Sequence, residues 1–349
     1  MTIKTTCIGA YPKPDYVPIS DWFQVGHDAQ DYTDKVIRVW ERHVDADAVA
    51  LMDKATEEVV ADQIACGITV PTDGEVRREN YVHYQCRQFE GFDFENLTRR
   101  TFRNGALTSE LPIIRGPVRR QGECALIRDW QIAEQAADRA VKITLPGPMT
   151  ISDTTADAFY EDPPRLANDL ADALNGEILA LAAAGCRHIQ IDEPVFARKP
   201  AQALEYGVEA LERCFHGVPS GVTRVMHMCC GYPNRLDQTD YPKADPQAYI
   251  EIANAIDGIV EEISIEDSHR HNPPELFEMF SRSALIVGFV TIASSTVETV
   301  DEIRNRMQSV LEHLPNERLI AAPDCGLGFL GRDLAMQKLR NLCAAANSF

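Results

Sequence analysis

The segment PPRLANDLADALNGEILALAAAGCRHIQIDEP, residues 163–194, decides the fold class because it combines a helical pattern with a strand pattern. Apolar residues recur every three or four positions and predict one buried helical face: Leu166, Leu170, Leu174, Ile178 and Leu181. The proline pair at 163–164 suits a first helical turn, and Gly185 suits a helix end. The following HIQIDEP is β-rich and ends in two carboxylates, which is typical of a strand in a parallel sheet.

Seven further β-like runs occur along the chain: TTCIGAY (5–11), ITVPTDGE (68–75), VKITLPGP (141–148), RVMHMCC (224–230), EISIED (262–267), ALIVGFV (284–290) and LIAAPDCG (319–326). Helical patterns also cover residues 46–66 and 301–314. Eight buried strands with helices between them, in a chain of 349 residues, predict a (β/α)8 TIM barrel in the α/β class. We expect one domain over residues 1–349. A doubly wound open sheet is the alternative.

Two connections are longer than one helix requires. Residues 12–45 include the aromatic residues Trp22 and Phe23, and residues 76–140 include a hairpin pattern with an Asn104-Gly105 turn. Because these connections follow the first and second predicted strands, we expect both insertions at the C-terminal mouth of the barrel. The sequence predicts that residues 76–140 form an inserted lid or hairpin within the single domain.

Charge and composition exclude several classes of protein. The formal net charge of −19 argues against nucleic acid or an anionic membrane surface as the main partner. No run approaches the roughly 20 apolar residues of a membrane span, and the N-terminus lacks the pattern of a signal peptide. We therefore expect a cytoplasmic protein. Its 10 cysteines have no regular spacing, so we expect most of them to be buried free thiols.

Chemically reactive side chains collect at the predicted strand ends, where barrel enzymes build their active sites. His227 and Cys229 alternate along one strand and should therefore face the same side. Adding Glu266 and Cys325 gives nitrogen, sulfur and oxygen donors that suit tetrahedral Zn²⁺. The alternative is a buried histidine beside structural cysteines. Four candidates at the ends of three predicted strands favour the metal.

Six motifs, in this order, carry a family resemblance: DGE (73–75), LPGPMT (145–150), QIDEP (190–194), HMCC (227–230), ISIED (263–267) and APDCGLG (322–328). Together they resemble the catalytic domain of the cobalamin-independent methionine synthase family over nearly the whole chain. The resemblance implies a (β/α)8 barrel that binds zinc through His227, Cys229, Glu266 and Cys325. It also implies that Glu75 and Asp192 bind the ammonium group of homocysteine.

The sequence departs from the family pattern at three places. Ala10 replaces the family's serine in the amino-acid site, and the aromatic residue expected after GP-x-T is missing around Thr154. The family's His-Ser-Pro motif, which supplies a proton donor, reads VTIASS at 290–295. His269, which follows Glu266, is a candidate replacement for that donor, and a solvated loop histidine is the alternative.

The favoured function is therefore zinc-dependent S-alkyl transfer, with methyl transfer to homocysteine giving methionine. The expected partners are a small-molecule thiol and a methyl or alkyl donor, either methyltetrahydrofolate or another carrier. One alternative is a coenzyme M-type thiol-epoxide transferase or lyase that uses the same zinc-thiolate chemistry. Another is a zinc-binding paralogue without catalysis.

Overall fold

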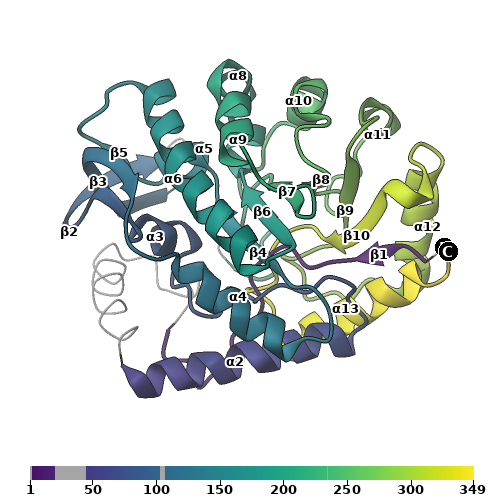
Figure 1. The fold of residues 1–349 in the computed structure, drawn as a ribbon. Coiled ribbons are helices and arrows are strands. Elements are labelled where there is room, and N and C mark those ends of the chain that lie inside the picture. Colours follow the sequence, from purple (N-terminus) through teal and green to yellow (C-terminus); the bar gives the residue numbers. More distant parts are fainter. Residues whose placement is uncertain (1, 20–44, 103–106, 234) are drawn as a thin grey trace.

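A computed structural model of the chain describes residues 2–19, 45–102, 107–233 and 235–349. Its main sheet contains seven parallel strands in the order β1-β10-β9-β8-β7-β6-β4 (Figure 1). These strands are β1 (Lys4–Thr5), β4 (Lys142–Pro146), β6 (His188–Asp192), β7 (Thr223–Met228), β8 (Glu262–Ile265), β9 (Ala284–Val290) and β10 (Leu319–Pro323). Strands from β4 to β10 follow one another around the sheet in chain order, as in a TIM barrel. A doubly wound sheet would reverse its order part-way, so that alternative is wrong.

Residues 68–72 connect the two edges of this curled sheet. Parallel backbone bridges pair Thr6 with Val70 and Thr72 with Lys142, so this segment lies between β1 and β4. The prediction of a continuous strand over residues 68–75 is wrong, because only isolated bridges form there. Pro71 explains part of the interruption, since proline has no N–H to donate to a ladder. The first strand is also shorter than the predicted 5–11.

Helices surround the sheet (Figure 1). The longer ones are α2 (Ala46–Ala65), α4 (Ala125–Ala136), α6 (Pro163–Ala184), α10 (Ala248–Ile256), α12 (Val300–Leu311) and α13 (Arg332–Ala346). Shorter ones are α3 (Tyr81–Cys86), α5 (Pro148–Asp153), α7 (Pro194–Arg198), α8 (Pro200–Gln202), α9 (Val208–Cys214) and α11 (Pro274–Met279). The π-helical turn η3 (Ala203–Gly207) and the 3-10 turn η4 (Asn316–Arg318) complete the helical segments. Within the described ranges, no helix is long and apolar enough to cross a membrane.

Helix α6 shows why the local prediction succeeded. The five predicted apolar positions are all buried, and the Asp162 side chain accepts a hydrogen bond from the Arg165 N–H at the first turn. Gly185 ends the helix with φ of 112°, a left-handed conformation that favours glycine. Helix periodicity, cap and stop signal therefore agree within one segment.

The insertion between residues 76 and 140 contains an antiparallel hairpin. Its strands β2 (Phe89–Phe102) and β3 (Leu107–Arg120) form a second sheet together with β5 (Ala156–Asp157). The hairpin is tied to α6, because Arg120 Nε lies 2.5 Å from the buried Glu177 carboxylate. The predicted Asn104-Gly105 turn and the aromatic residues Trp22 and Phe23 lie outside the described residues. A lid role for residues 76–140 stays a prediction.

Candidate metal and substrate site

The candidate residues lie at the C-terminal ends of neighbouring strands. The paired ladder of β7 and β8 ends with Met228 opposite Ile265. Cys229 and Glu266 are therefore the first residues beyond it. Cys325 follows β10 by two residues, and Asp192 is the last residue of β6. Because all these strands are parallel, their carboxyl ends place these side chains at one mouth of the barrel.

One imidazole and two thiols converge at this mouth. The possible ligand atoms of His227, Cys229 and Cys325 all lie within 4.8 Å of one another. His227 Nε2 lies 3.4 Å from Cys325 Sγ, while its Nδ1 lies 2.9 Å from Ser264 Oγ. A tetrahedral zinc ion with bonds of about 2.1 Å to nitrogen and 2.3 Å to sulfur separates such ligands by about 3.5 Å. The three side chains therefore fit zinc.

The protonation states of these groups also suit a metal. Burial lowers the pKa of His227 to about 3, so the imidazole is neutral at physiological pH, as a ligand must be. A hydrogen bond to the Cys325 thiol, together with burial, raises the pKa of Cys229 well above its usual value. In the chain alone both thiols therefore hold their protons. A cation between them would favour the thiolates.

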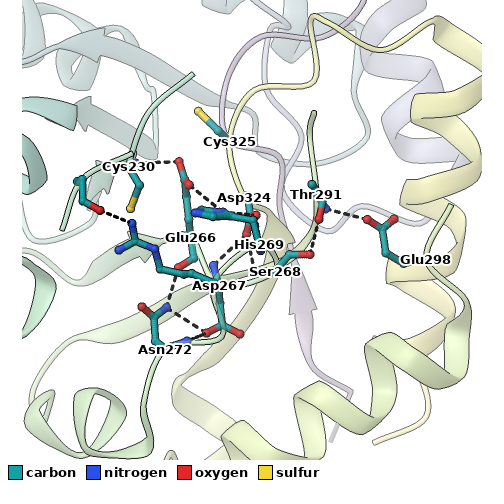
Figure 2. A network of polar contacts seen from close by, with 12 residues as sticks. Cys230, Glu266, Asp267, Ser268, His269, Asn272, Thr291, Glu298, Asp324 and Cys325 are labelled. Carbon is teal, nitrogen blue, oxygen red and sulfur yellow. Dashed lines mark hydrogen bonds and ion pairs between the residues drawn. The ribbon is translucent and has the colours of Figure 1, made fainter. Parts of the chain in front are cut away.

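Glu266 lies between this group and a second cluster of possible ligands. Its side chain shares a hydrogen bond with Cys229 and accepts one from the Cys230 backbone N–H at 2.9 Å. Its other oxygen lies 3.1 Å from His269 Nδ1. Cys230, Glu266 and His269 thus form a second set of possible ligand atoms within 4.8 Å, drawn in Figure 2. The structure therefore groups three of the four predicted metal ligands, and the fourth, Glu266, falls in the second group and contacts the first through Cys229.

His269 is fixed in place by Asp324 (Figure 2). The Asp324 carboxylate accepts the backbone N–H groups of Asp267, Ser268 and His269, and it lies 3.0 Å from His269 Nδ1. The His269 side chain is 7% exposed, so it is not a solvated loop histidine. Its Nε2 is buried and makes no hydrogen bond to the described part of the chain. His269 therefore keeps one ring nitrogen without a hydrogen bond within the described residues, while the other contacts Glu266 and Asp324.

Two carboxylates form the second part of the mouth. Glu75 accepts a hydrogen bond of 2.7 Å from Thr144 Oγ1, and Asp192 accepts one of 2.7 Å from Gln190 Nε2. Burial raises the pKa of Asp192 well above its usual value, and the nearby Glu75 charge raises it further. Arg78 Nη1 lies 3.5 Å from Glu75 and offsets part of that charge. Because the charge of each buried acid disfavours ionisation of the other, a bound cation such as an ammonium group would stabilise the pair.

Ala10 lies between Glu75 and the loop that follows Cys325. A Cβ added to its neighbour Gly9 would lie 2.6 Å from Glu75 Oε1, and one added to Gly326 would lie 3.1 Å from Ala10 Cβ. The Ala10 carbonyl accepts the Leu327 N–H at 2.7 Å. A side chain at residue 9 would therefore displace the Glu75 carboxylate, and one at residue 326 would press on Ala10. Ala10 therefore lies where the predicted substrate-binding and metal-binding residues meet.

Sequence reasoning missed two tyrosines of this site. The pKa of Tyr81 is raised by burial and then by Asp192 and Cys229, so its ring lies among the predicted residues. The pKa of Tyr241 is raised by burial and by Glu266 and Cys229. Tyr81 belongs to the aromatic stretch after DGE, and that stretch was the only available signal. Glu193 of the QIDEP motif has a structural role, because its carboxylate accepts the Met149 and Thr150 N–H groups at the start of α5.

Comparisons with known proteins find relatives of the whole chain. A family model described as "Cobalamin-independent synthase, Catalytic domain" matches residues 3–348. Methionine synthase from Saccharolobus solfataricus is 31% identical over 343 residues, covering 97% of this chain and 92% of the relative. Methionine synthase from Sulfurisphaera tokodaii is 28% identical, covering 97% of this chain and 90% of the relative.

Two solved structures share the fold of this chain. A B12-independent methionine synthase from Shewanella sp. W3-18-1, in complex with selenomethionine, matches with a TM-score of 0.83 and 25% identity. That match covers 99% of this chain and 97% of the other. A further structure from Listeria monocytogenes has a TM-score of 0.64 at 19% identity, covers 95% of this chain and 98% of the other, and shows the shared fold. The TM-scores confirm the predicted barrel class.

Proposed function

This chain belongs to the family of cobalamin-independent synthase catalytic domains, and we propose that it transfers a methyl group to the sulfur of homocysteine, giving methionine. The observation that carries this proposal is that two groups of reactive side chains lie at one mouth of the barrel. A pair of buried carboxylates suits an amino-acid ammonium group, and a cluster of imidazole and thiols suits a metal that activates sulfur. Relatives named methionine synthase, matching over 97% of the chain, support it.

The proposed cofactor is Zn²⁺, held by His227, Cys229, Glu266 and Cys325. The separation of His227 Nε2 and Cys325 Sγ supports this assignment, as does the neutral state of the imidazole. When bound, zinc supplies a positive charge that lowers the pKa of a substrate thiol, which is otherwise about 8.5, while leaving its sulfur nucleophilic. The set of one nitrogen, two sulfur and one oxygen donor matches the ligands that zinc accepts.

The chain's own residues bind and orient the substrate. Glu75 and Asp192 hold the ammonium group, and its positive charge favours the ionised form of Asp192. Thr144 and Gln190 fix the two carboxylates through hydrogen bonds of 2.7 Å each. Held at this end, homocysteine directs its sulfur toward Cys229 and Cys325. Fixing both reactants in this way lowers the entropic part of the barrier.

The transfer itself forms one carbon–sulfur bond as the bond between the methyl carbon and its donor breaks. The homocysteine thiol gives up its proton when it ionises, and the electron pair of the broken bond goes to the donor. When the donor is methyltetrahydrofolate, its nitrogen then takes up a proton. We propose that His269 Nε2 supplies this proton, because the nitrogen makes no hydrogen bond within the described residues and the ring lies against the proposed ligand Glu266, 3.1 Å from Nδ1. Asp324 holds the ring through Nδ1 at 3.0 Å and leaves Nε2 for the donor.

The test is to incubate the purified, zinc-loaded chain with homocysteine and ¹³C-methyl donors and to detect labelled methionine by mass spectrometry. The donors are methyltetrahydrofolate, its polyglutamate form and methylcobalamin. Labelled methionine from any of them supports the proposal, and Glu75→Gln should reduce its rate. A chain that forms no methionine with any donor, yet opens an epoxide with a thiol, would contradict the proposal.

A further inference from the structure

The sheet does not reach two of the proposed metal ligands. The last paired residues of β7 and β8 are Met228 and Ile265, so Cys229 and Glu266 lie just beyond the ladder. Backbone pairing between these strands therefore stops one residue short of the two ligands. Another contact must hold these strand ends in register if a metal is to find its ligands preorganised.

Tyr249 of α10 makes such a contact. Its hydroxyl donates to the Met228 carbonyl at 2.6 Å, and it accepts the Glu266 backbone N–H at 3.2 Å. The Cys230 thiol donates to the same oxygen at 2.9 Å. The three bonds use the one proton and both lone pairs of the hydroxyl. A single oxygen thus links the residues on both sides of Cys229 to the residue that carries the Glu266 carboxylate.

The surroundings of Tyr249 make this link rigid. Its side chain is 0% exposed, so water cannot replace any of the three bonds. The Arg270 guanidinium lies 5.3 Å from the centre of its ring. The Cys230 N–H also donates to the Glu266 carboxylate at 2.9 Å, so movement of Cys230 would move that carboxylate. The position of Glu266 therefore depends on the Tyr249 oxygen through both backbone and side chain.

We propose that the Tyr249 hydroxyl is a positioning group, which holds Cys229 and Glu266 at the separation that the metal requires. This inference rests on the zinc site of the proposed function. The hydrogen bonds of the Tyr249 hydroxyl go to the Met228 carbonyl, the Glu266 backbone N–H and the Cys230 thiol, not to a proposed ligand atom. Its effect should therefore appear in metal affinity and in the geometry of the bound metal.

The test compares the zinc affinity of Tyr249→Phe with that of the wild-type chain, by competition with a chromophoric chelator. The phenyl ring keeps the buried volume and removes only the oxygen. Groups that orient metal ligands typically contribute 10- to 100-fold to affinity, and we expect a loss of about that size. The absorption spectrum of the Co²⁺-substituted variant should also change, because the ligand geometry has relaxed.

A matched control is Tyr160→Phe. The Tyr160 hydroxyl is also buried, accepts the Val118 N–H at 2.8 Å and donates to Asp169 at 2.6 Å, but it lies on the hairpin side of the molecule. This variant should lose thermal stability without losing zinc affinity. An equal loss of zinc affinity in both variants would overturn the inference, since general destabilisation would then explain it.

Cys230→Ala gives a second, milder test that does not depend on Tyr249→Phe folding. It removes one of the three bonds to the hydroxyl, and we expect zinc to bind about 2- to 10-fold more weakly. Unchanged affinity would contradict the inference, and so would complete loss of zinc, because Cys230 would then be a ligand. If the wild-type chain binds no zinc, the proposed metal site itself fails. If the wild type and Tyr249→Phe bind zinc equally, only the positioning role fails.

Discussion

Replacing Asp192 with asparagine should weaken homocysteine binding and stabilise the free protein at neutral pH. Asparagine has the same shape, and its Oδ1 can still accept the Gln190 amide bond of 2.7 Å. The substitution removes one charge-assisted hydrogen bond to the substrate ammonium group, which contributes about 1.5–3 kcal/mol. The dissociation constant of homocysteine should therefore rise about 10- to 150-fold, since about 1.4 kcal/mol corresponds to a factor of ten.

Asp192→Asn should weaken substrate binding but stabilise the free protein, because the pKa of Asp192 is raised in the folded state by burial and by Glu75. The folded chain then binds this proton more tightly than the unfolded chain, in which the pKa is about 3.9. That contribution to stability is complete below the unfolded pKa and is lost as the pH rises through the folded pKa. The neutral asparagine side chain avoids the loss, so Asp192→Asn should melt at a higher temperature than wild type near pH 7 and lose this advantage near pH 4.

Two assays check both parts of this reasoning. Isothermal titration calorimetry measures homocysteine binding, and differential scanning calorimetry between pH 4 and pH 8 measures thermal stability without substrate. Glu262→Gln is the control, because burial also raises the pKa of Glu262, at the opposite end of the barrel, where β8 begins. It should leave homocysteine binding unchanged. An Asp192→Asn chain that binds homocysteine like wild type, or is less stable at every pH, would refute the reasoning.

Three further outcomes follow from the geometry. Cys229→Ser and Cys325→Ser should each lose zinc and methyl transfer together, as measured by metal analysis and product formation, and stoichiometric zinc in both would contradict the site. His269→Gln should lower kcat while leaving the zinc content unchanged, if the ring supplies a proton, and an unchanged kcat would remove that role. Leu174→Ala on the buried face of α6 should lower the free energy of unfolding by about 2–5 kcal/mol in urea, because Leu174 is 0% exposed. A loss below about 1 kcal/mol would show that this face packs loosely.

The elements predicted best are those whose signals lie within one segment. In α6 the apolar face, the proline pair at 163–164 and the stop at Gly185 lie within one segment, and the helix begins and ends where they indicate. The prediction of a strand over residues 68–75 was wrong, because an apolar run indicates a strand without showing whether each backbone N–H has a partner. Pro71 and the position of this segment between β1 and β4 leave only isolated bridges.

In the candidate site, too, the sequence predicted some residues and not others. Alternation on a strand and position at a strand end suffice to bring His227, Cys229 and Cys325 to one mouth, because a parallel barrel gathers the ends of all its strands. The assignment of Glu266 as a fourth ligand stays a prediction. The partners that hold these groups come from distant segments. Tyr249 reaches β7 and β8 from a helix, and its sequence neighbourhood carries no sign of that role. Such contacts depend on tertiary packing.

The most direct test of the account is X-ray absorption at the zinc K-edge of the purified chain, before and after homocysteine is added. We expect one zinc ion per chain with two sulfur ligands at about 2.3 Å and lighter ligands from His227 and Glu266 at about 2.1 Å. Homocysteine should add a third sulfur. A shell that contains no sulfur, or one that is unchanged by saturating homocysteine, would contradict the account.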